Sequence, residues 1–313
     1  MRVVVTGGAG FIGANTARML TAGGMEVVVV DDLSSGRRDN LDGVNVDLCE
    51  GSVLDAGLLD VAVAGADAII HLAAVASVPR SIADPLGSHH ANVTGTLQVL
   101  EAARRHGNPQ VIVASSSAVY GPSPDLPSHE GLRAAPISPY AVSKLATEAY
   151  AIAYAECYQL DVLALRFFNV FGPLQPAGHV YAAVVPAFID AALVRRPVPV
   201  YGDGSQTRDF AHVDSVAGVL HRAVAERVSA REPVNLAFGT RTSLRDLLQL
   251  IEQLLGRPVE VEHHPVRAGD VPHSQADGTR LQELFPGLEP LPLADGVRST
   301  IEWFQHERAR GTH

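Results

Sequence analysis

The stretch Thr6-Gly7-Gly8-Ala9-Gly10-Phe11-Ile12-Gly13 decides the fold of this chain. It follows an apolar run, Val3–Val5, that predicts a buried strand, and it opens residues 11–24, whose apolar spacing predicts a helix. Glycines at such a turn let the backbone approach a pyrophosphate closely, while the helix N-terminus offers free N–H groups to the anion. The stretch therefore predicts a dinucleotide-binding turn. Its predicted contacts are Gly7, Gly10, Phe11, Ile12 and Gly13.

An acidic pair follows the second apolar run. Residues 26–30 predict a second strand, and Asp31 and Asp32 come directly after it. A carboxylate at this distance from the glycines accepts hydrogen bonds from the adenosine ribose hydroxyls and repels a 2′-phosphate, which favours NAD over NADP. Arg37 and Arg38 are close enough in sequence to meet such a phosphate, and the irregular loop before them leaves their direction open. We predict NAD as the cofactor, with Asp31 and Asp32 among its contacts.

The composition excludes several classes of protein. The chain has 313 residues and a formal net charge of −10, so it is a poor binder of nucleic acid or anionic membranes. Its apolar runs stay well short of the ~18 residues of a membrane span, and its first run ends at the glycines, unlike a signal peptide. Two cysteines far apart in sequence predict no disulfide framework and favour a cytoplasmic setting. The thirteen histidines lack the spacing of metal ligands, so we predict no metal.

The order of elements predicts the fold class. Short apolar runs alternate with helical stretches at about 11–24, 86–106 and 141–158, which calls for a parallel sheet with right-handed crossovers. After about residue 172 the alternation breaks and proline and glycine become frequent. We predict a doubly wound parallel (Rossmann) sheet over residues 1–172, with return segments from about 208–240, and a smaller mixed α/β domain for substrate mainly within 173–313. The runs expected as buried strands are Val3–Val5, Val27–Val30, Ala68–Ile70, Val111–Ala114 and Val162–Leu165.

A tyrosine and a lysine stand four residues apart in the third helical stretch. Tyr140 and Lys144 share a helix face at this spacing, so both can point into one site. A nearby ammonium is expected to lower the pKa of the phenol, and a tyrosine poised near neutral pH can accept a proton from a sugar hydroxyl. The serine-rich turn 115–117 follows a predicted strand at the carboxyl end, where a doubly wound sheet binds its ligands. A serine there can hydrogen-bond both the substrate hydroxyl and the tyrosine oxygen.

These motifs carry a family resemblance along nearly the whole chain. The sequence resembles the extended short-chain dehydrogenase/reductase family, in its NAD-dependent epimerase/dehydratase branch, and in particular the nucleotide-sugar epimerases. The shared motifs are TGGAGFIG at 6–13, DDLSSG at 31–36, HLAA at 71–74, NVTGT at 92–96, SSSAVYG at 115–121, SPYAVSK at 138–144, RFFNVFGP at 166–173, GDGSQTRDF at 202–210 and RAGD at 267–270.

The resemblance implies roles for particular residues. The implied catalytic set is Ser116, Tyr140 and Lys144. Tyr140 and Lys144 would also contact the cofactor, together with Leu72, Ala73, Ala74 and Asn92. The implied contacts to a UDP-sugar are Ser116, Ser117, Asn169, Val185, Val200, Tyr201, Arg208, Arg267 and Asp270. Among these, Asn169, Arg208 and Arg267 would hold the diphosphate, and Val200 and Tyr201 would cradle the uracil. Family members usually form homodimers, so a homodimer is expected by resemblance.

Two arginines can neutralise a diphosphate inside an acidic protein, because each guanidinium binds phosphate oxygens through two hydrogen bonds. The alternative for Arg208 and Arg267 is an ordinary salt bridge to the nearby Asp209 and Asp270, worth at most ~1 kcal/mol at the surface.

The turn at 115–121 indicates which reaction to expect. Related 4,6-dehydratases carry acidic residues where this chain has Ser117 and Ala118, so the groups needed to eliminate water are missing. The decarboxylases are disfavoured for the same reason. Asn169 and Pro176 stand where uronate epimerases carry Thr and Arg, which counts against a uronate. We therefore predict a UDP-hexose 4-epimerase, acting on UDP-glucose and UDP-galactose or on a UDP-N-acetylhexosamine. The alternatives are a UDP-glucuronate 4-epimerase, an NAD(P)H-dependent 4-ketosugar reductase and a non-catalytic nucleotide sensor.

Overall fold

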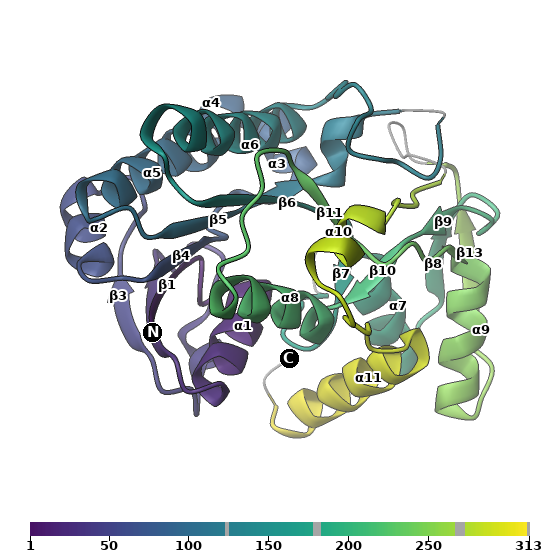
Figure 1. The fold of residues 1–313 in the computed structure, drawn as a ribbon. Helices are drawn as coiled ribbons and strands as arrows, with labels where there is room; N and C mark the ends of the chain where they lie inside the picture. Colours follow the sequence, from purple (N-terminus) through teal and green to yellow (C-terminus); the bar gives the residue numbers. More distant parts are fainter. Residues whose placement is uncertain (123–124, 178–182, 267–272, 312–313) are drawn as a thin grey trace.

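A seven-stranded parallel sheet forms the centre of the molecule (Figure 1). The computed structural model describes residues 1–122, 125–177, 183–266 and 273–311. Along the sheet the strands run in the order β11-β6-β5-β4-β1-β2-β3, so the chain moves outward from β1 in both directions. This topology confirms the predicted doubly wound fold. The strands are β1 Arg2–Thr6, β2 Glu26–Asp31, β3 Asp47–Glu50, β4 Ala68–His71, β5 Gln110–Ser116, β6 Val162–Phe167 and β11 Val234–Leu236.

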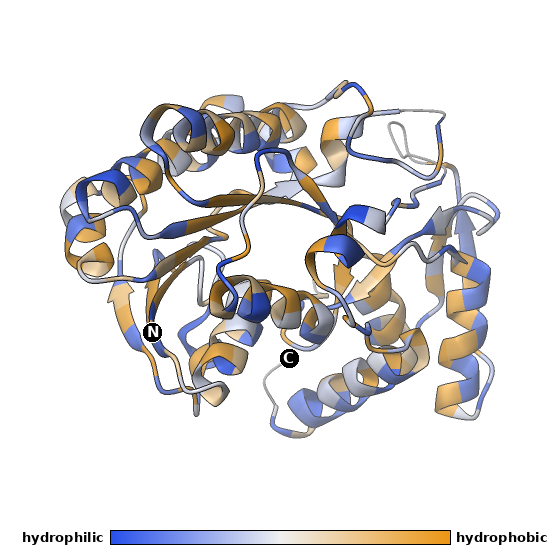
Figure 2. Ribbon diagram, viewed as in Figure 1, coloured by the Kyte–Doolittle hydropathy of each residue, from blue (hydrophilic) through white to orange (hydrophobic). Residues whose placement is uncertain are grey.

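Helices cover both faces of the sheet. Within β1, Val4 packs toward the layer of α2, α5 and α6, whereas Val3 and Val5 pack toward the layer of α1 and α8. Burial on both faces explains why the strands are continuous apolar runs, shown in orange in Figure 2. The helices of the two layers are α1 Phe11–Ala22, α2 Ala56–Val63, α5 Gly95–Arg105, α6 Pro139–Tyr158 and α8 Val213–Ala225.

The structure differs from the sequence prediction at several places in this first unit, and α2 is among the elements that were not predicted. β3 and β11 were not predicted, because β3 is half-exposed and β11 has three residues, so neither gives a long apolar run. The single helix expected at 86–106 is broken into α4 (Pro85–His89), a π-helical turn (His90–Thr94) and α5. A π turn adds one residue to a helical turn, and local apolar spacing does not reveal it.

The remaining elements form a smaller unit with its own core, on the right in Figure 1. Three two-stranded sheets and three helices pack around Phe171, Phe188, Ile251 and Phe304. The strands are β7 Asn169–Phe171, β8 Val198–Tyr201, β9 Thr207–Arg208, β10 Phe210–His212, β12 Thr242–Ser243 and β13 Val261–His264. The helices are α7 Val184–Leu193, α9 Leu244–Leu255 and α11 Leu293–Ala309, whereas α10 Thr279–Leu284 packs on β11 and belongs to the core of the first unit. After β10 the chain returns from the smaller unit to the first unit, where α8 packs on α1 and β11 pairs with β6.

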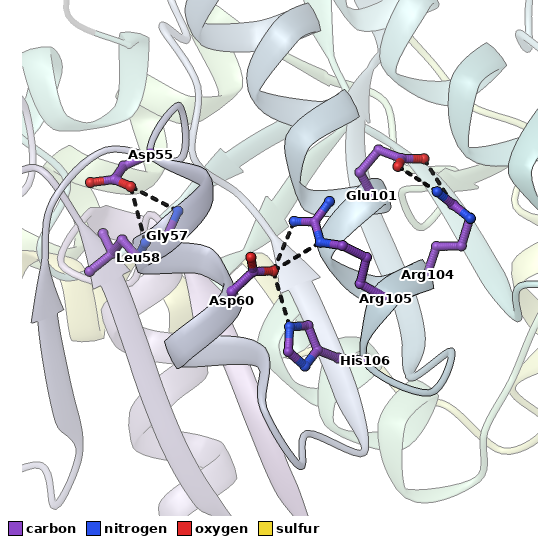
Figure 3. A network of polar contacts seen from close by, with 8 residues as sticks. All are labelled: Asp55, Gly57, Leu58, Asp60, Glu101, Arg104, Arg105 and His106. Carbon is purple, nitrogen blue, oxygen red and sulfur yellow. Dashed lines mark hydrogen bonds and ion pairs between the residues drawn. The ribbon is translucent and has the colours of Figure 1, made fainter.

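Charged side chains tie the outer helices together at the surface (Figure 3). Asp60 of α2 accepts hydrogen bonds from Arg105 at 2.8 Å and from His106 at 3.0 Å, at the end of α5. Exposed pairs of this kind contribute at most about 1 kcal/mol each. Among the described residues, no helix is both long and apolar enough to cross a membrane.

Candidate active site

A cavity of about 850 Å³ opens at the carboxyl ends of the central strands. It is lined by the glycine turn after β1, by the ends of β2, β4 and β5, and by the start of α6. It brings together most of the residues predicted to contact the cofactor or to act in catalysis. These are Gly7, Gly10, Phe11, Ile12, Gly13, Asp31, Asp32, Leu72, Ala73, Ala74, Ser116, Tyr140 and Lys144.

The glycine turn leaves room for a ligand only because side chains are missing from it. Gly7 has a φ of +69°, and a Cβ there would lie 2.7 Å from the backbone nitrogen of Ala73. A Cβ on Gly13 would lie 2.1 Å from the Gly7 carbonyl oxygen. Gly10 is the N-cap of α1, and no side chain in the described structure caps this helix end. The turn therefore offers unpaired N–H groups and a close backbone approach, which fits a pyrophosphate.

Asp31 holds the turn as well as lining the cavity. Its carboxylate accepts hydrogen bonds from the backbone N–H of Ala9 and of Leu33, both at 2.9 Å. A carboxylate has further lone pairs for ribose hydroxyls. Arg37 and Arg38 pair with Asp39 and Glu50 respectively, so the two cations considered for a 2′-phosphate already have carboxylate partners.

Asn92, which the sequence predicted as a cofactor contact, does not line the cavity. Its side chain is buried behind the loop that follows β4, where it accepts a hydrogen bond from the Val75 N–H at 2.7 Å. Its amide also donates to the Ser143 Oγ at 2.9 Å. Asn92 therefore ties the cofactor-lining loop to α6 instead of contacting the cavity. Ser117 likewise is absent from the lining, because it begins the 3₁₀ turn 117–120.

The three predicted catalytic residues meet in the cavity. Ser116 ends β5, and its hydroxyl forms a hydrogen bond with the Tyr140 hydroxyl. Lys144 lies one turn further along α6 and donates from Nζ to the Ala114 carbonyl at 2.8 Å. Burial lowers the pKa of this ammonium to about 8. A parallel strand end and a helix start thus place a hydroxyl pair beside a buried cation.

The expected effect of Lys144 on Tyr140 is not found. Burial raises the pKa of the Tyr140 phenol above its usual value, and the Ser116 hydrogen bond opposes this only in part. The Lys144 ammonium points to the Ala114 carbonyl instead. In the protein alone, desolvation therefore has the larger effect on the pKa of Tyr140. The positive charge of a bound nicotinamide would favour the phenolate form.

A buried histidine connects the glycine turn to the catalytic helix. His71 ends β4, and its ring nitrogens lie 2.7 Å from Thr6 Oγ1 and 3.1 Å from Thr96 Oγ1. Thr96 in turn donates to the Asn92 carbonyl at 2.6 Å and lies 3.1 Å from Thr147 Oγ1 on α6. Burial, helped by the Lys144 charge, lowers the pKa of His71 to about 3. His71 is therefore neutral in the folded protein at ordinary pH.

Replacing His71 should change the acid stability of the protein. Between pH 6.5 and about 3 the unfolded chain binds a proton at His71 that the folded protein does not, so the free energy of unfolding falls as pH falls. This loss amounts to roughly 2 kcal/mol between pH 6.5 and 5. Urea denaturation at both pH values should show a smaller loss for His71→Asn than for the wild type. The exposed variant His89→Asn should match the wild type, and equal losses for all three would contradict the assignment.

A second cavity of about 730 Å³ lies in the smaller unit beside the first. Phe168, Val170 and Ala183 line both cavities. Of the predicted substrate contacts, the second cavity is lined by Asn169, Val185, Tyr201 and Arg208.

Val200, like Ser117, is a predicted substrate contact that lines neither cavity, and two others lie outside the described residues. Val200 is fully buried in the core of the smaller unit, so its side chain does not reach the second cavity, because alternate residues of β8 face opposite ways. Its neighbours Pro199 and Tyr201 line the cavity instead. Arg267 and Asp270 lie outside the described residues.

Several lining residues were not predicted from the sequence. The last turns of α11 and of α3 (Val78–Ala83) reach the first cavity, although neither helix carries a motif. These residues are Arg80, Trp303, His306, Glu307 and Arg310. No local signal marks the α11 residues, because only the packing of the C-terminal helix brings them to the cavity.

Comparison with known proteins assigns the family. The profile of the NAD-dependent epimerase/dehydratase family matches residues 3–237. The chain belongs to this family. Membership confirms the predicted resemblance, the enzyme class and NAD as cofactor. Within the described residues, no cluster of His, Cys, Asp and Glu could hold a metal ion.

Three similar members of the epimerase/dehydratase family share almost the whole chain. The sequence is 39% identical to UDP-glucose 4-epimerase of Mycolicibacterium smegmatis, over 98% of this chain and 99% of the relative. The structure of UDP-N-acetylglucosamine 4-epimerase from Methanobrevibacter ruminantium, in complex with UDP-N-acetylmuramic acid, superposes with a TM-score of 0.93, at 36% identity and 98% of both chains. UDP-glucose 4-epimerase of Thermotoga maritima with UDP-glucose gives 0.92, at 34% identity, over 98% of this chain and all of that one.

Proposed function

We propose that this protein is a UDP-hexose 4-epimerase that interconverts UDP-glucose and UDP-galactose. The observation that carries the proposal is that the two cavities lie side by side and share Phe168, Val170 and Ala183 in their linings. One holds the glycine turn and the Ser116–Tyr140 pair, and the other holds Asn169 and Arg208. A nucleotide bound in the second cavity would extend its sugar past Phe168 and Val170 to the catalytic hydroxyls.

NAD would be held by the glycine turn, Asp31 and the 72–74 segment. When bound, it would accept a hydride from the sugar and later return it. Tyr140 removes the proton from the sugar 4-hydroxyl. The hydrogen bond between Ser116 and Tyr140 holds the phenol hydroxyl in position. Lys144 holds its buried ammonium against the Ala114 carbonyl, where it would bind the nicotinamide ribose of the cofactor. Arg208 and Asn169 bind the diphosphate and leave the sugar free to turn over.

The residues beside Ser116 argue against elimination of water. Ser117 and Ala118 form the 3₁₀ turn after β5 and carry no carboxyl group. The lining of the first cavity, to which Tyr140 belongs, includes the small residues Ala74, Ala76 and Ala91. Small side chains permit a larger substituent on the sugar without requiring one, so a UDP-N-acetylhexosamine is the second candidate substrate.

Proton NMR of the purified protein, without added NAD, tests this function. The protein is incubated separately with UDP-galactose, UDP-N-acetylgalactosamine and UDP-galacturonate, and the anomeric signal of each is followed. We expect the gluco epimer of UDP-galactose to appear, with retained NAD sufficient for turnover. Conversion of the N-acetylated sugar alone would name the second candidate, and conversion of the uronate alone would name the glucuronate epimerase. No conversion, with or without NAD, would overturn the epimerase proposal in favour of a reductase.

We propose further that the protein is a cytoplasmic homodimer that packs through α3, α4 and α6. Ile82, Leu86 and Val142 are 64%, 73% and 53% exposed on these adjoining helices. Burying such apolar side chains against a second copy stabilises an interface. Light scattering should give a dimer for the wild type and a monomer for Leu86→Asp. A monomeric wild type would contradict the dimer.

A further inference from the structure

A buried carboxylate stands between two residues that line the second cavity. Asp209 is fully buried, while its neighbours Arg208 and Phe210 both face the cavity. Asp209 connects β9 to β10. The sequence left open a salt bridge from this carboxylate to Arg208. The structure instead places the Asp209 carboxylate against backbone and hydroxyl donors from other segments.

The Asp209 side chain joins two distant loops. One carboxylate oxygen accepts a hydrogen bond from the Thr240 hydroxyl at 2.9 Å, and the other accepts one from the Ala276 N–H at 3.1 Å. The backbone N–H groups of Phe238 and Thr240 also donate to it. An ionised carboxylate is acceptor-only, with about four lone-pair sites, so it matches this set of donors.

The Asp209 main-chain carbonyl contacts Asn169, which lines the second cavity. Its carbonyl oxygen accepts from the Asn169 backbone N–H at 3.3 Å and from the Asn169 side-chain amide at 3.1 Å. Arg208 donates from Nη1 to the Thr207 carbonyl at 2.9 Å, and the same carbonyl accepts from the Ser274 N–H at 3.0 Å. One residue therefore connects Asn169 to the strand that carries Arg208.

We infer that Asp209 is a positioning residue, which fixes Arg208 and, through its own carbonyl, Asn169 at the second cavity by anchoring the chain between β9 and β10 to the 238–240 and 274–277 segments. This inference rests on the proposed function, in which that cavity binds the nucleotide diphosphate. The consequence is a defect in nucleotide affinity when the anchor is lost. The hydride-transfer site around Tyr140 lies in the first cavity and keeps its own contacts.

Asp209→Asn is the sharpest test because it preserves size. An amide keeps one accepting oxygen and presents a donor in place of the other, so the donors around this side chain lose one of its two acceptors. Thr240→Val removes a single hydroxyl donor and serves as a milder variant that should fold even if Asp209→Asn does not. Asp203→Asn alters an exposed carboxylate of the neighbouring turn, which bonds Ser205 and Arg245, and serves as the control.

Three quantities separate the outcomes: the dissociation constant of UDP by calorimetry, KM and kcat with UDP-galactose, and the NAD content of the purified protein. We expect Asp209→Asn to weaken UDP binding and to raise KM about tenfold or more, with kcat within about threefold of wild type and NAD content unchanged. Thr240→Val should show a smaller loss in the same direction, and Asp203→Asn none.

The results that overturn the inference differ from those that overturn the function. A wild-type protein that binds UDP, with variants that bind it equally well, would show that Asp209 does not position the nucleotide site. A lower kcat or NAD content at unchanged KM would also contradict it, since a merely structural role predicts general damage. A wild-type protein that binds no UDP would remove the proposed function itself, and the inference with it.

Discussion

Replacement of Tyr140 by phenylalanine is expected to lower kcat at least about a hundredfold, in line with the usual contribution of general acid–base catalysis. The change removes one oxygen and its hydrogen bond with Ser116 while keeping the ring at the start of α6. Tyr140 is the proposed base, so without its hydroxyl this position can no longer accept the proton of the sugar hydroxyl. Nucleotide affinity should be nearly unchanged, because Asn169 and Arg208 line the other cavity.

The measurement is kcat by the NMR assay, with NAD content and UDP affinity measured on the same preparation. Tyr150→Phe is the matched control, because Tyr150 lies on the same helix and is 40% exposed at the surface. It should retain wild-type kcat. A kcat of Tyr140→Phe close to that of the wild type would contradict the assignment of Tyr140 as the base.

Gly13→Ala should abolish NAD binding and destabilise the protein. The added methyl group would lie 2.1 Å from the Gly7 carbonyl oxygen and 2.7 Å from the Gly8 Cα, both backbone atoms that cannot turn aside. Relief requires α1 to move away from the glycine turn, which opens the site where the helix N-terminus meets the pyrophosphate. Overpacking of this kind costs about 1–3 kcal/mol.

NAD content after purification and the urea midpoint measure these two effects. Gly57→Ala is the control, because its methyl group would meet its nearest neighbour, the Asp55 carboxylate, at 3.4 Å, and alanine is the better helix former in α2. It should keep its NAD and be at least as stable as the wild type. A Gly13→Ala protein with full NAD content would contradict the close approach assigned to this turn.

The sequence alone determined those features that a few neighbouring residues encode. The glycine turn at 6–13, the buried strands and the i, i+4 spacing of Tyr140 and Lys144 are local, and the structure has them where the sequence predicts. Strands buried on both faces must be apolar throughout, and a helix must bring i and i+4 to one face, so these features follow from backbone geometry. The family motifs share this local character, which is why the family could be predicted as well.

Only the tertiary structure decided which way the less distinctive side chains face. Asn92 turns to Ser143, 51 residues away, and Asp209 turns to Ala276, 67 residues away, and no spacing along the chain predicts either partner. Burial raises the pKa of Tyr140, whereas the sequence predicted that the nearby Lys144 would lower it. The extent of burial depends on the whole fold and not on the residue one helical turn away. Burial and long-range hydrogen bonds arise from packing between segments, so the sequence specified the chemistry of the site and the fold specified which residues face it.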